Sequence, residues 1–134
     1  MAQENVEILK RSNAAFNRRD REAAFADYHP DIELLDLQPA PDSPGRLVGR
    51  SAVYAYWAQW EDSFAEFTAE IEQYIEVGDY VVTETHWRAT GKDTGLQTDL
   101  RTADVFEFAD GKIVRATLAY ENTDQALKAI ELAE

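Results

Sequence analysis

The chain contains no cysteine, and this excludes disulfide bonds and metal sites built from thiolates. Nothing in the composition therefore points to an oxidising compartment. The chain also lacks the run of about 20 apolar residues that a membrane-spanning helix needs. Its first residues include acidic side chains where a signal peptide would be apolar. We expect a cytoplasmic protein with no membrane partner.

Basic residues are scarce: 13 lysines and arginines stand against 26 aspartates and glutamates, which gives a net charge of −13. A surface of this sign repels phosphate backbones, so no nucleic-acid partner is expected. The 134 residues fit a single domain spanning residues 1–134, with no length left for a second. A chain of this size can bury about two thirds of its unfolded surface, which is enough for a core without cross-links.

Several catalytic motifs are absent as well. There is no glycine-rich phosphate loop, no Gly-x-Ser-x-Gly turn and no cysteine nucleophile. The two histidines, His29 and His86, are far apart and share no motif, so we expect neither a metal site nor a cofactor. His86 is out of phase with Trp87 and in phase with Glu84 and Arg88, which predicts that it points away from the helices.

The first part of the chain predicts two helices and a strand. Apolar residues recur every three or four positions over residues 3–19, which is the pattern of an amphipathic helix. Asp20 can cap a second, short helix, and this helix must stop before Pro30. Residues 32–38 then predict a strand. The loop at 38–46 holds three of the four prolines, and long loops of this kind often border a functional opening.

The clearest helix is predicted to begin with Ser51 as its N-cap. Its apolar residues fall on a single helical stripe, which is typical of a core face. The stripe would line a pocket wherever a sheet curves away from it. The residues of this stripe are Val53, Tyr56, Trp57, Trp60, Phe64 and Phe67.

After this helix the apolar period changes to two, which is typical of half-buried strands. Glycine-containing turns at 78–79, 91–95 and 110–111 separate the alternating segments, and Asn122 or Thr123 can cap a final helix. Strands linked in this way form an antiparallel meander, and with the helices on one face they define the α+β class. The four predicted strands are residues 69–77, 80–90, 96–108 and 112–120.

Two aspartates interrupt apolar faces, and burying a polar group costs free energy unless the group is paired. Asp104 shares a face with apolar residues of its predicted strand, and Asp36 does so on the first strand. The second assignment is weaker because alternate leucines make the opposite face apolar too. The neighbours in phase are Leu96, Leu100, Phe106 and Phe108 for Asp104, and Ile32 and Leu34 for Asp36.

Apolar surroundings destabilise a carboxylate, so the pKa of such an aspartate rises and its side chain can stay protonated near neutral pH. Two carboxyl groups in unequal surroundings can divide acid–base work, with one accepting a proton and the other donating a hydrogen bond. The alternative is that each aspartate pairs with an arginine or a backbone N–H in a structural role. The arginines available for such pairs are Arg46, Arg50, Arg101 and Arg115.

Four short segments resemble a known family: residues 15–20 (AFNRRD), 28–36 (YHPDIELLD), 49–51 (GRS) and 104–115 (DVFEFADGKIVR). In these segments and in the order of its elements, the chain resembles the nuclear transport factor 2-like superfamily. Within it, the resemblance is to the SnoaL-like polyketide cyclases and ketosteroid isomerases, and it covers nearly the whole chain. It implies a cystatin-like cone of curved antiparallel sheet wrapped around helices, with an internal pocket. It also implies a homodimer formed through the outer face of the sheet.

The resemblance implies roles for both aspartates. In ketosteroid isomerases a base aspartate ends the first strand, where this chain has Asp36. A protonated aspartate in a later strand donates to the substrate oxygen, where this chain has Asp104. The first hypothesis is therefore a cofactor-free enzyme that transfers protons on a small lipophilic carbonyl compound, as an isomerase, cyclase or dehydratase. The residues expected to hold the substrate are Ser12, Phe16, Tyr28, Trp57, Trp60, Phe106, Leu118 and Tyr120.

Two departures from the family pattern narrow this hypothesis. Ser12 stands where the isomerases have an oxyanion tyrosine, and its hydroxyl is shorter and less acidic. Thr85, Trp87 and Ala119 stand where the superfamily's epoxide hydrolases need an arginine and two aspartates, so epoxide hydrolysis is not expected. The second hypothesis is a non-catalytic domain of the same fold that holds an apolar ligand or associates through its surface, with both aspartates paired to arginines.

Overall fold

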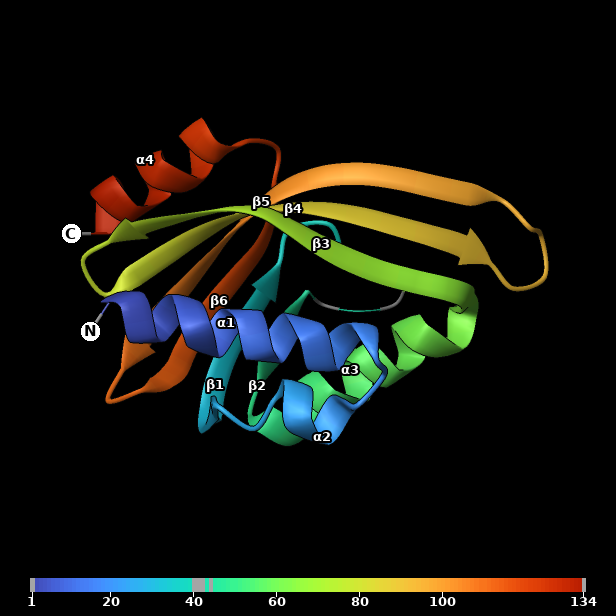
Figure 1. Cartoon of the computed structure of the whole chain (residues 1–134), viewed down its shortest axis with the longest axis horizontal. Helices are drawn as coiled ribbons and strands as arrows, with labels where there is room; N and C mark the ends of the chain where they lie inside the picture. The colour runs from blue at the N-terminus through green and yellow to red at the C-terminus, as the bar shows by residue number, and fades with distance from the viewer. Residues whose placement is uncertain (1, 40–42, 44, 134) are drawn as a thin grey trace.

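The computed structural model describes residues 2–39, 43 and 45–133. These residues form two helices, two strands and a third helix, followed by a run of four strands and a last helix (Figure 1). The elements are α1 (Ala2–Asn17), α2 (Arg21–Ala24), β1 (Tyr28–Asp36), β2 (Arg46–Val48), α3 (Arg50–Ser63), β3 (Phe64–Val77), β4 (Tyr80–Gly91), β5 (Gln97–Ala109), β6 (Lys112–Tyr120) and α4 (Thr123–Ala133).

The strands form one six-stranded sheet in the order β2-β1-β6-β5-β4-β3. β3 to β6 are the predicted antiparallel meander, in which each strand pairs with the next along the chain. β1 adds to β6 in the parallel direction, and β2 closes that edge as an antiparallel partner of β1. The sheet curves around α1 and α3 without closing on itself, and this confirms the predicted α+β class with a curved sheet (Figure 1).

The helices do not all lie on one face of the sheet, and in this respect the sequence-based expectation was wrong. α1 and α3 lie on the concave face, whereas α4 packs on the opposite, outer face (Figure 1). Ala126 and Ile130 of α4 form a separate cluster with Val82, Ala103 and Val105. The side chains of these strand residues point to the outer face of the sheet. This stretch of sheet is therefore apolar on both faces, and each face is buried by helices.

Helix caps were predicted well where a side chain makes the cap. The Asp20 side chain accepts from the Ala23 N–H at the start of α2, and the Asn122 side chain accepts from the Gln125 N–H at the start of α4. The cap of α3 is different, because the N-cap is Gly49 and makes no side-chain hydrogen bond. Gly49 has a φ of 98°, in the left-handed region that only glycine adopts without strain.

The element boundaries differ from the predicted ones in three places. β1 runs from residue 28 to 36, where residues 32–38 were predicted, and a register shift between Tyr28 and Glu33 accommodates Pro30. The three-residue strand β2 was not predicted. α3 ends at Ser63, so the last two aromatic residues of the predicted stripe belong to β3. The proline-rich loop predicted at 38–46 lies partly outside the described residues.

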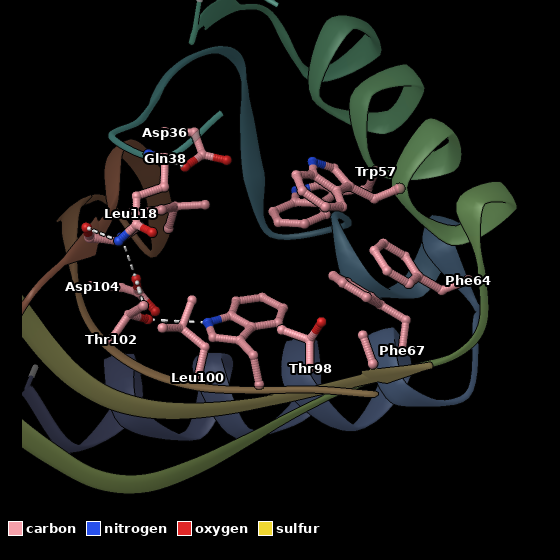
Figure 2. Close-up of a pocket in the computed structure, with 14 residues that line it drawn as sticks. Asp36, Gln38, Trp57, Phe64, Phe67, Thr98, Leu100, Thr102, Asp104 and Leu118 are labelled. Carbon is pink, nitrogen blue, oxygen red and sulfur yellow. Dashed lines mark hydrogen bonds between the residues drawn. The ribbon is translucent and has the colours of Figure 1, made fainter. Parts of the chain in front are cut away.

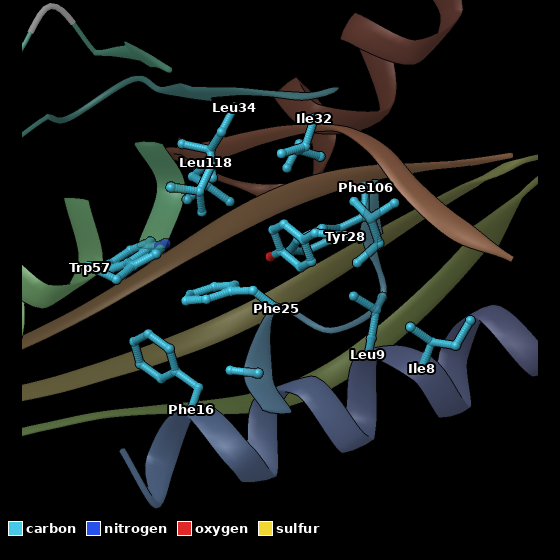
Figure 3. Close-up of a cluster of buried hydrophobic side chains, with 14 of the residues drawn as sticks. Ile8, Leu9, Phe16, Phe25, Tyr28, Ile32, Leu34, Trp57, Phe106 and Leu118 are labelled. Carbon is cyan, nitrogen blue, oxygen red and sulfur yellow. The ribbon is translucent and has the colours of Figure 1, made fainter. Parts of the chain in front are cut away.

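The main core lies between the concave face of the sheet and the helices (Figure 3). Ile32 and Leu34 of β1, Val53 of α3 and Ile113 of β6 are almost fully buried there. No helix in the described parts of the chain is long and apolar enough to cross a membrane.

Candidate functional site

A cavity of about 200 Å³ opens between α3 and the concave face of the sheet (Figure 2). We call it the outer cavity. One wall is aromatic and comes from α3, β3 and β4, whereas the other end is polar and comes from the end of β1 and from β5 and β6. The aromatic wall consists of Trp57, Trp60, Phe64, Phe67 and Trp87, and the polar end of Asp36, Gln38, Thr102, Asp104 and Ala119.

The aromatic wall is built of rings that hold one another in place. Trp57 of α3 stacks on Trp87 of β4 with ring centroids 5.8 Å apart and planes 12° apart. Trp60 stacks on Phe67 at 5.9 Å, and Phe67 also contacts Trp87 at 5.4 Å. Offset stacking of this kind is worth about 1 kcal/mol per pair beyond the burial of area. The wall is therefore an ordered apolar surface suited to flat or ring-shaped molecules.

Asp104 lies on β5 at the polar end and is only 3% exposed. Its Oδ1 accepts from the Ala119 N–H at 2.8 Å and from the Thr102 hydroxyl at 3.4 Å. Its Oδ2 accepts from the Thr85 hydroxyl at 2.8 Å. The Trp87 indole N–H donates to the Thr102 oxygen at 3.0 Å, so the hydroxyl of Thr102 is oriented toward the carboxylate (Figure 2).

Burial raises the pKa of Asp104 to about 6 from its ordinary 3.8, because the charged form loses its hydration. The hydrogen bonds from Ala119, Thr85 and Thr102 oppose this shift, and the charge of Asp36 adds to it. The direction matches the prediction made from the apolar neighbours of Asp104. A pKa of about 6 nevertheless leaves the ligand-free side chain mostly ionised at pH 7, whereas the sequence suggested a neutral group.

A proton on Asp104 is best placed on Oδ2. Oδ1 already has two donors, because the Ala119 N–H can only donate and the Thr102 hydroxyl, which accepts from Trp87, donates its own proton to the same oxygen. The Thr85 hydroxyl at Oδ2 lies 3.2 Å from the Thr83 hydroxyl, and either of these can be the donor. Thr85 therefore donates to the carboxylate, and when Oδ2 is protonated it can turn toward Thr83 and leave that proton for a ligand oxygen.

Asp36 ends β1, lines the same cavity and is 7% exposed. Its Oδ2 accepts from the Tyr56 hydroxyl at 2.8 Å, and its Oδ1 accepts from the Gln38 N–H at 2.9 Å. The structure thus brings Asp36 and Asp104 to one cavity, which the sequence could not establish. Tyr56, predicted as part of the apolar stripe and not as a partner of Asp36, holds the Asp36 carboxylate in position.

Neither aspartate forms an ion pair with an arginine among the described residues, so the arginine version of the structural alternative is wrong. The backbone version holds in part, because each aspartate accepts one backbone N–H. The four arginines have other partners. Arg46 pairs with Glu33, Arg101 with Glu72, and Arg115 with Glu33 and Glu107, while Arg50 donates to the carbonyl oxygens of Ala26 and Tyr28.

A bulge in β6 lies between the two aspartates: it contacts Asp104 directly and Asp36 through Gln38. Ala119 has a φ of 73°, which is strained for alanine, and the pairing of β5 with β6 shifts register at this point. The bulge turns the Ala119 N–H out of the ladder and toward Asp104, while the Ala119 carbonyl accepts from the Gln38 side chain at 3.3 Å. An alanine carries no sequence signal for such a conformation, so sequence reasoning missed this group.

The predicted substrate-binding residues divide into three sets. Trp57, Trp60 and Leu118 line the outer cavity. A second cavity of about 70 Å³ lies deeper, and we call it the inner cavity; Ser12, Phe16, Tyr28 and Phe106 line it, together with Trp57, Leu118 and Asp104. Tyr120 lines neither.

The placement of Tyr120 corrects the sequence-based expectation. Strict alternation puts Leu118 and Tyr120 on the same face of β6, but the bulge at Ala119 inserts one residue and changes the phase. Tyr120 therefore packs on the outer face with the cluster around Ile130 of α4. We leave it out of the proposed site.

Ser12 reaches the inner cavity but is already engaged. Its hydroxyl donates to the Ala24 carbonyl oxygen at 2.6 Å and so ties α1 to α2. The only proton of the side chain is used in this bond. Ser12 thus cannot donate to a ligand oxygen as the oxyanion tyrosine of the isomerases does.

In the part of the chain that the structure describes, no three histidine, aspartate or glutamate side chains come together as a metal site requires. His86 lies on the outer face, as predicted, where its Nε2 is bonded to Asp99. This hydrogen bond lowers the pKa of Asp99. His29 accepts the Asp31 N–H through Nδ1 and takes no part in the cavities.

The fold and the cavity define the class of the protein, a small α+β domain with a curved sheet folded over helices. A model of the SnoaL-like domain matches residues 9–116, and the chain belongs to this family. No match was found among curated proteins.

Solved structures share the fold over nearly the whole chain. TerC, co-crystallised with polyporic acid, is 23% identical with a TM-score of 0.78, and the match covers 96% of this chain and 98% of TerC. An NTF2-like protein of unknown function from Burkholderia pseudomallei is 25% identical with a TM-score of 0.77, covering 93% and 95% of the two chains. A putative isomerase from Bacillus subtilis is 20% identical with a TM-score of 0.77, covering 96% and 94%.

Proposed function

We propose that the chain is a cofactor-free enzyme that binds a small lipophilic carbonyl compound in the outer cavity and moves protons on it. The observation that carries this proposal is the pair of buried aspartates at the polar end of an aromatic cavity, neither of them neutralised by a cation among the described residues. Buried carboxylates without cations cost stability, and natural proteins retain such groups chiefly where they act.

The two aspartates have different surroundings and take different roles. Asp36 accepts a proton from the carbon next to the carbonyl group, and Tyr56 holds its carboxylate in place. Asp104 binds the carbonyl oxygen, on which negative charge develops as the proton leaves. A ligand that fills the cavity displaces water and raises the pKa of Asp104 further above about 6, so that Asp104 takes up a proton and donates it toward the oxygen. The reaction type is that of an isomerase, cyclase or dehydratase.

The substrate class follows from the walls. Trp57, Trp60 and Phe67 offer flat apolar surface, and among the described residues no lysine or arginine lines the outer cavity to hold an anionic group. TerC, with the same fold, was co-crystallised with a small organic molecule, polyporic acid. This supports a small organic ligand for a cavity of this fold.

The second candidate is a non-catalytic ligand-binding domain of the same fold. It is favoured by one observation: both oxygens of Asp104 already have hydrogen-bond partners in the absence of a ligand. In that case the cavity binds the same kind of molecule, but no proton is transferred.

Proton transfer can be tested without knowledge of the natural product. We propose following exchange of the α-protons of 2-tetralone for deuterium in D₂O by NMR. The chain should accelerate exchange over buffer, and Asp36→Asn and Asp104→Asn should each lose about 100-fold of that acceleration, the usual contribution of a general acid or base. Asp62→Asn, at an exposed position on α3, is the matched control and should keep it.

The two candidates give different results in this experiment. Binding of 2-tetralone without accelerated exchange supports the non-catalytic domain. If Asp104→Asn still accelerates the exchange of α-protons, the role assigned to Asp104 is contradicted.

A cytoplasmic homodimer is a further part of the proposal. Leu35 and Val48 are exposed on β1 and β2 and face the outer side of the sheet, where a second copy could cover them. Sedimentation of the purified chain tests this, and a monomer at all concentrations would contradict it.

A further inference from the structure

Asp104 stands between the two cavities, and its two oxygen atoms receive hydrogen bonds from different walls. Ala119 and Thr102, which donate to Oδ1, line the outer cavity and not the inner one. Thr85, which donates to Oδ2, lines the inner cavity and not the outer one. Hydrogen bonds therefore link the carboxyl group to the walls of both cavities.

The proposed function requires Asp104 to take up a proton when a ligand fills the outer cavity. The same ligand displaces the water that would carry a proton through this cavity. The Ala119 N–H cannot pass a proton on, because a backbone amide only donates. The hydroxyl of Thr102 belongs to the wall of the cavity that the ligand fills. While the ligand is bound, a proton therefore has to reach Asp104 by a second route.

No neighbouring charged group can supply this proton. Asp36, whose charge raises the pKa of Asp104, is the acceptor of the ligand's own proton. Burial and, next, the charge of Asp104 raise the pKa of Tyr28, so this phenol keeps its proton. Among the described residues, no lysine, arginine or histidine lines either cavity. The proton has to come from solvent, through groups that both accept and donate one.

Two threonine hydroxyls connect Oδ2 to the inner cavity. The Thr85 hydroxyl lies 2.8 Å from Oδ2 and 3.2 Å from the Thr83 hydroxyl, and either threonine can donate to the other. Thr83 is fully buried and lines the inner cavity. A hydroxyl group has one proton to give and lone pairs to accept another, so this pair can pass a proton along.

The inner cavity is large enough and polar enough for water. Its volume of about 70 Å³ corresponds to about two molecules at the ~30 Å³ that each water occupies in the liquid. A buried water needs about two to four polar partners, and Ser12, Asn13 and Tyr28 are polar side chains in the wall. Asn13 and Ile71 line the cavity and are only half-buried, so the cavity approaches solvent between α1 and β3.

We propose that Asp104 receives its proton from the inner cavity, through Thr83 and Thr85, while a ligand occupies the outer cavity. A solvent proton, carried by water in the inner cavity, binds the Thr83 oxygen. The original proton of Thr83 passes to Thr85, and that of Thr85 passes to Oδ2. Each hydroxyl loses one proton and gains one, so only Asp104 changes its charge. The Thr85 hydroxyl then points toward Thr83, which leaves the proton on Oδ2 for the ligand oxygen.

This inference rests on the proposed function, which supplies the ligand and the proton uptake, and the test follows both events together. The chain is mixed rapidly with 2-ethylnaphthalene at pH 7 in weak buffer that contains a pH indicator. All three tryptophans line the outer cavity, so their fluorescence reports binding, while the indicator reports proton uptake. In the wild type the two signals should change together, because the proton enters with the ligand in place.

Thr83→Val keeps the shape of the side chain and removes its hydroxyl. Proton uptake should then lag behind binding by at least about tenfold, within the ~100-fold that a positioned proton carrier contributes. Thr83→Ser restores the hydroxyl and should bring the two signals together again. The amount of proton taken up at equilibrium should stay the same, whereas a purely structural role of Thr83 would change this amount and cause no lag. Thr68→Val, at an exposed position on β3, is the matched control and should behave as the wild type.

Thr85→Val is the second variant. It removes the donor to Oδ2, so it should delay proton uptake and also raise the pKa of Asp104, whereas Thr83→Val changes only the rate. Uptake that keeps pace with binding in both valine variants, an equal lag in the wild type, or a serine variant as slow as Thr83→Val would each overturn the relay. A wild type that does not bind 2-ethylnaphthalene, or binds it without proton uptake, would overturn the proposed function and the relay with it.

Discussion

Asp104 is surrounded by hydrogen-bond donors and is still costly to ionise. Three groups donate to it, but burial outweighs them and raises its pKa to about 6. The sequence indicated this residue because a carboxyl group stands in phase with Phe106 and Phe108. It did not indicate the donors, because Thr85 comes from a neighbouring strand and the Ala119 N–H from a bulge.

The raised pKa of Asp104 makes stability depend on pH. Since the folded-state pKa lies above the ordinary 3.8, folding favours the protonated form, and stability is lost as the pH rises through about 6. Two pKa units correspond to about 3 kcal/mol. Asp104→Asn should therefore be more stable than the wild type by up to about 3 kcal/mol at pH 8 and about equal to it at pH 4. Urea unfolding across this range measures the difference, and a variant that is less stable at pH 8 would refute the explanation.

The Tyr56 hydroxyl donates a hydrogen bond to the carboxylate of Asp36, as the Thr85 hydroxyl does to that of Asp104. Tyr56→Phe leaves the ring and removes the donor to the Asp36 Oδ2. The free energy of unfolding should fall by about 2 kcal/mol, the cost of losing a hydrogen bond to a buried charge. Equal stability of Tyr56→Phe and the wild type in chemical denaturation would show that the bond contributes nothing.

At the scale of elements, the sequence predicted the meander and the caps at Asp20 and Asn122, because turns, alternation and side-chain caps are local signals. The end of α3 was predicted too late. Phe64 and Phe67 continue the helical stripe by spacing, but they pair with β4 as the start of β3. This pairing is a long-range contact, and a periodicity of one segment carries no information about it.

The bulge at Ala119 is a second element that local patterns did not indicate. Ala119→Gly should relieve the strain of a φ of 73° and raise the free energy of unfolding by about 1 kcal/mol. The pKa of Asp104, followed by carbon NMR, should stay the same, because the N–H that donates to it is retained. Ala119→Val, which cannot adopt this φ without strain, should be destabilised instead. Equal stability of the glycine and valine variants would contradict a strained bulge.

At the scale of the whole molecule, the sheet separates the cavities on its concave face from the apolar cluster under α4 on its outer face. Its concave face and the helices α1 and α3 form the cavities, whereas α4 covers the outer face (Figure 1). The sequence predicted both aspartates and much of the aromatic wall. It could not predict the division into an outer and an inner cavity, which depends on the curvature of six strands, nor the outward position of Tyr120, which depends on the bulge.

This separation predicts that stability and binding respond differently to changes on the outer face. Ile130→Ala removes a side chain that is 3% exposed and packs with Val82 and Val105. The free energy of unfolding should fall by about 3 kcal/mol. Affinity for 2-ethylnaphthalene, measured well below the melting temperature, should change less than about twofold. A loss of affinity in proportion to the loss of stability would contradict the separation.

The central claim is that an apolar molecule enters the cavity beside Asp104 and shifts its protonation. The most direct measurement is the affinity of 2-ethylnaphthalene from pH 5 to pH 8, for the wild type and for Asp104→Asn. Ligand burial should raise the pKa of Asp104, so the wild type should bind about tenfold more tightly at pH 5 than at pH 8, with uptake of a proton, and Asp104→Asn should bind equally at both. The same pH dependence in both proteins, or no binding to either, would contradict the claim.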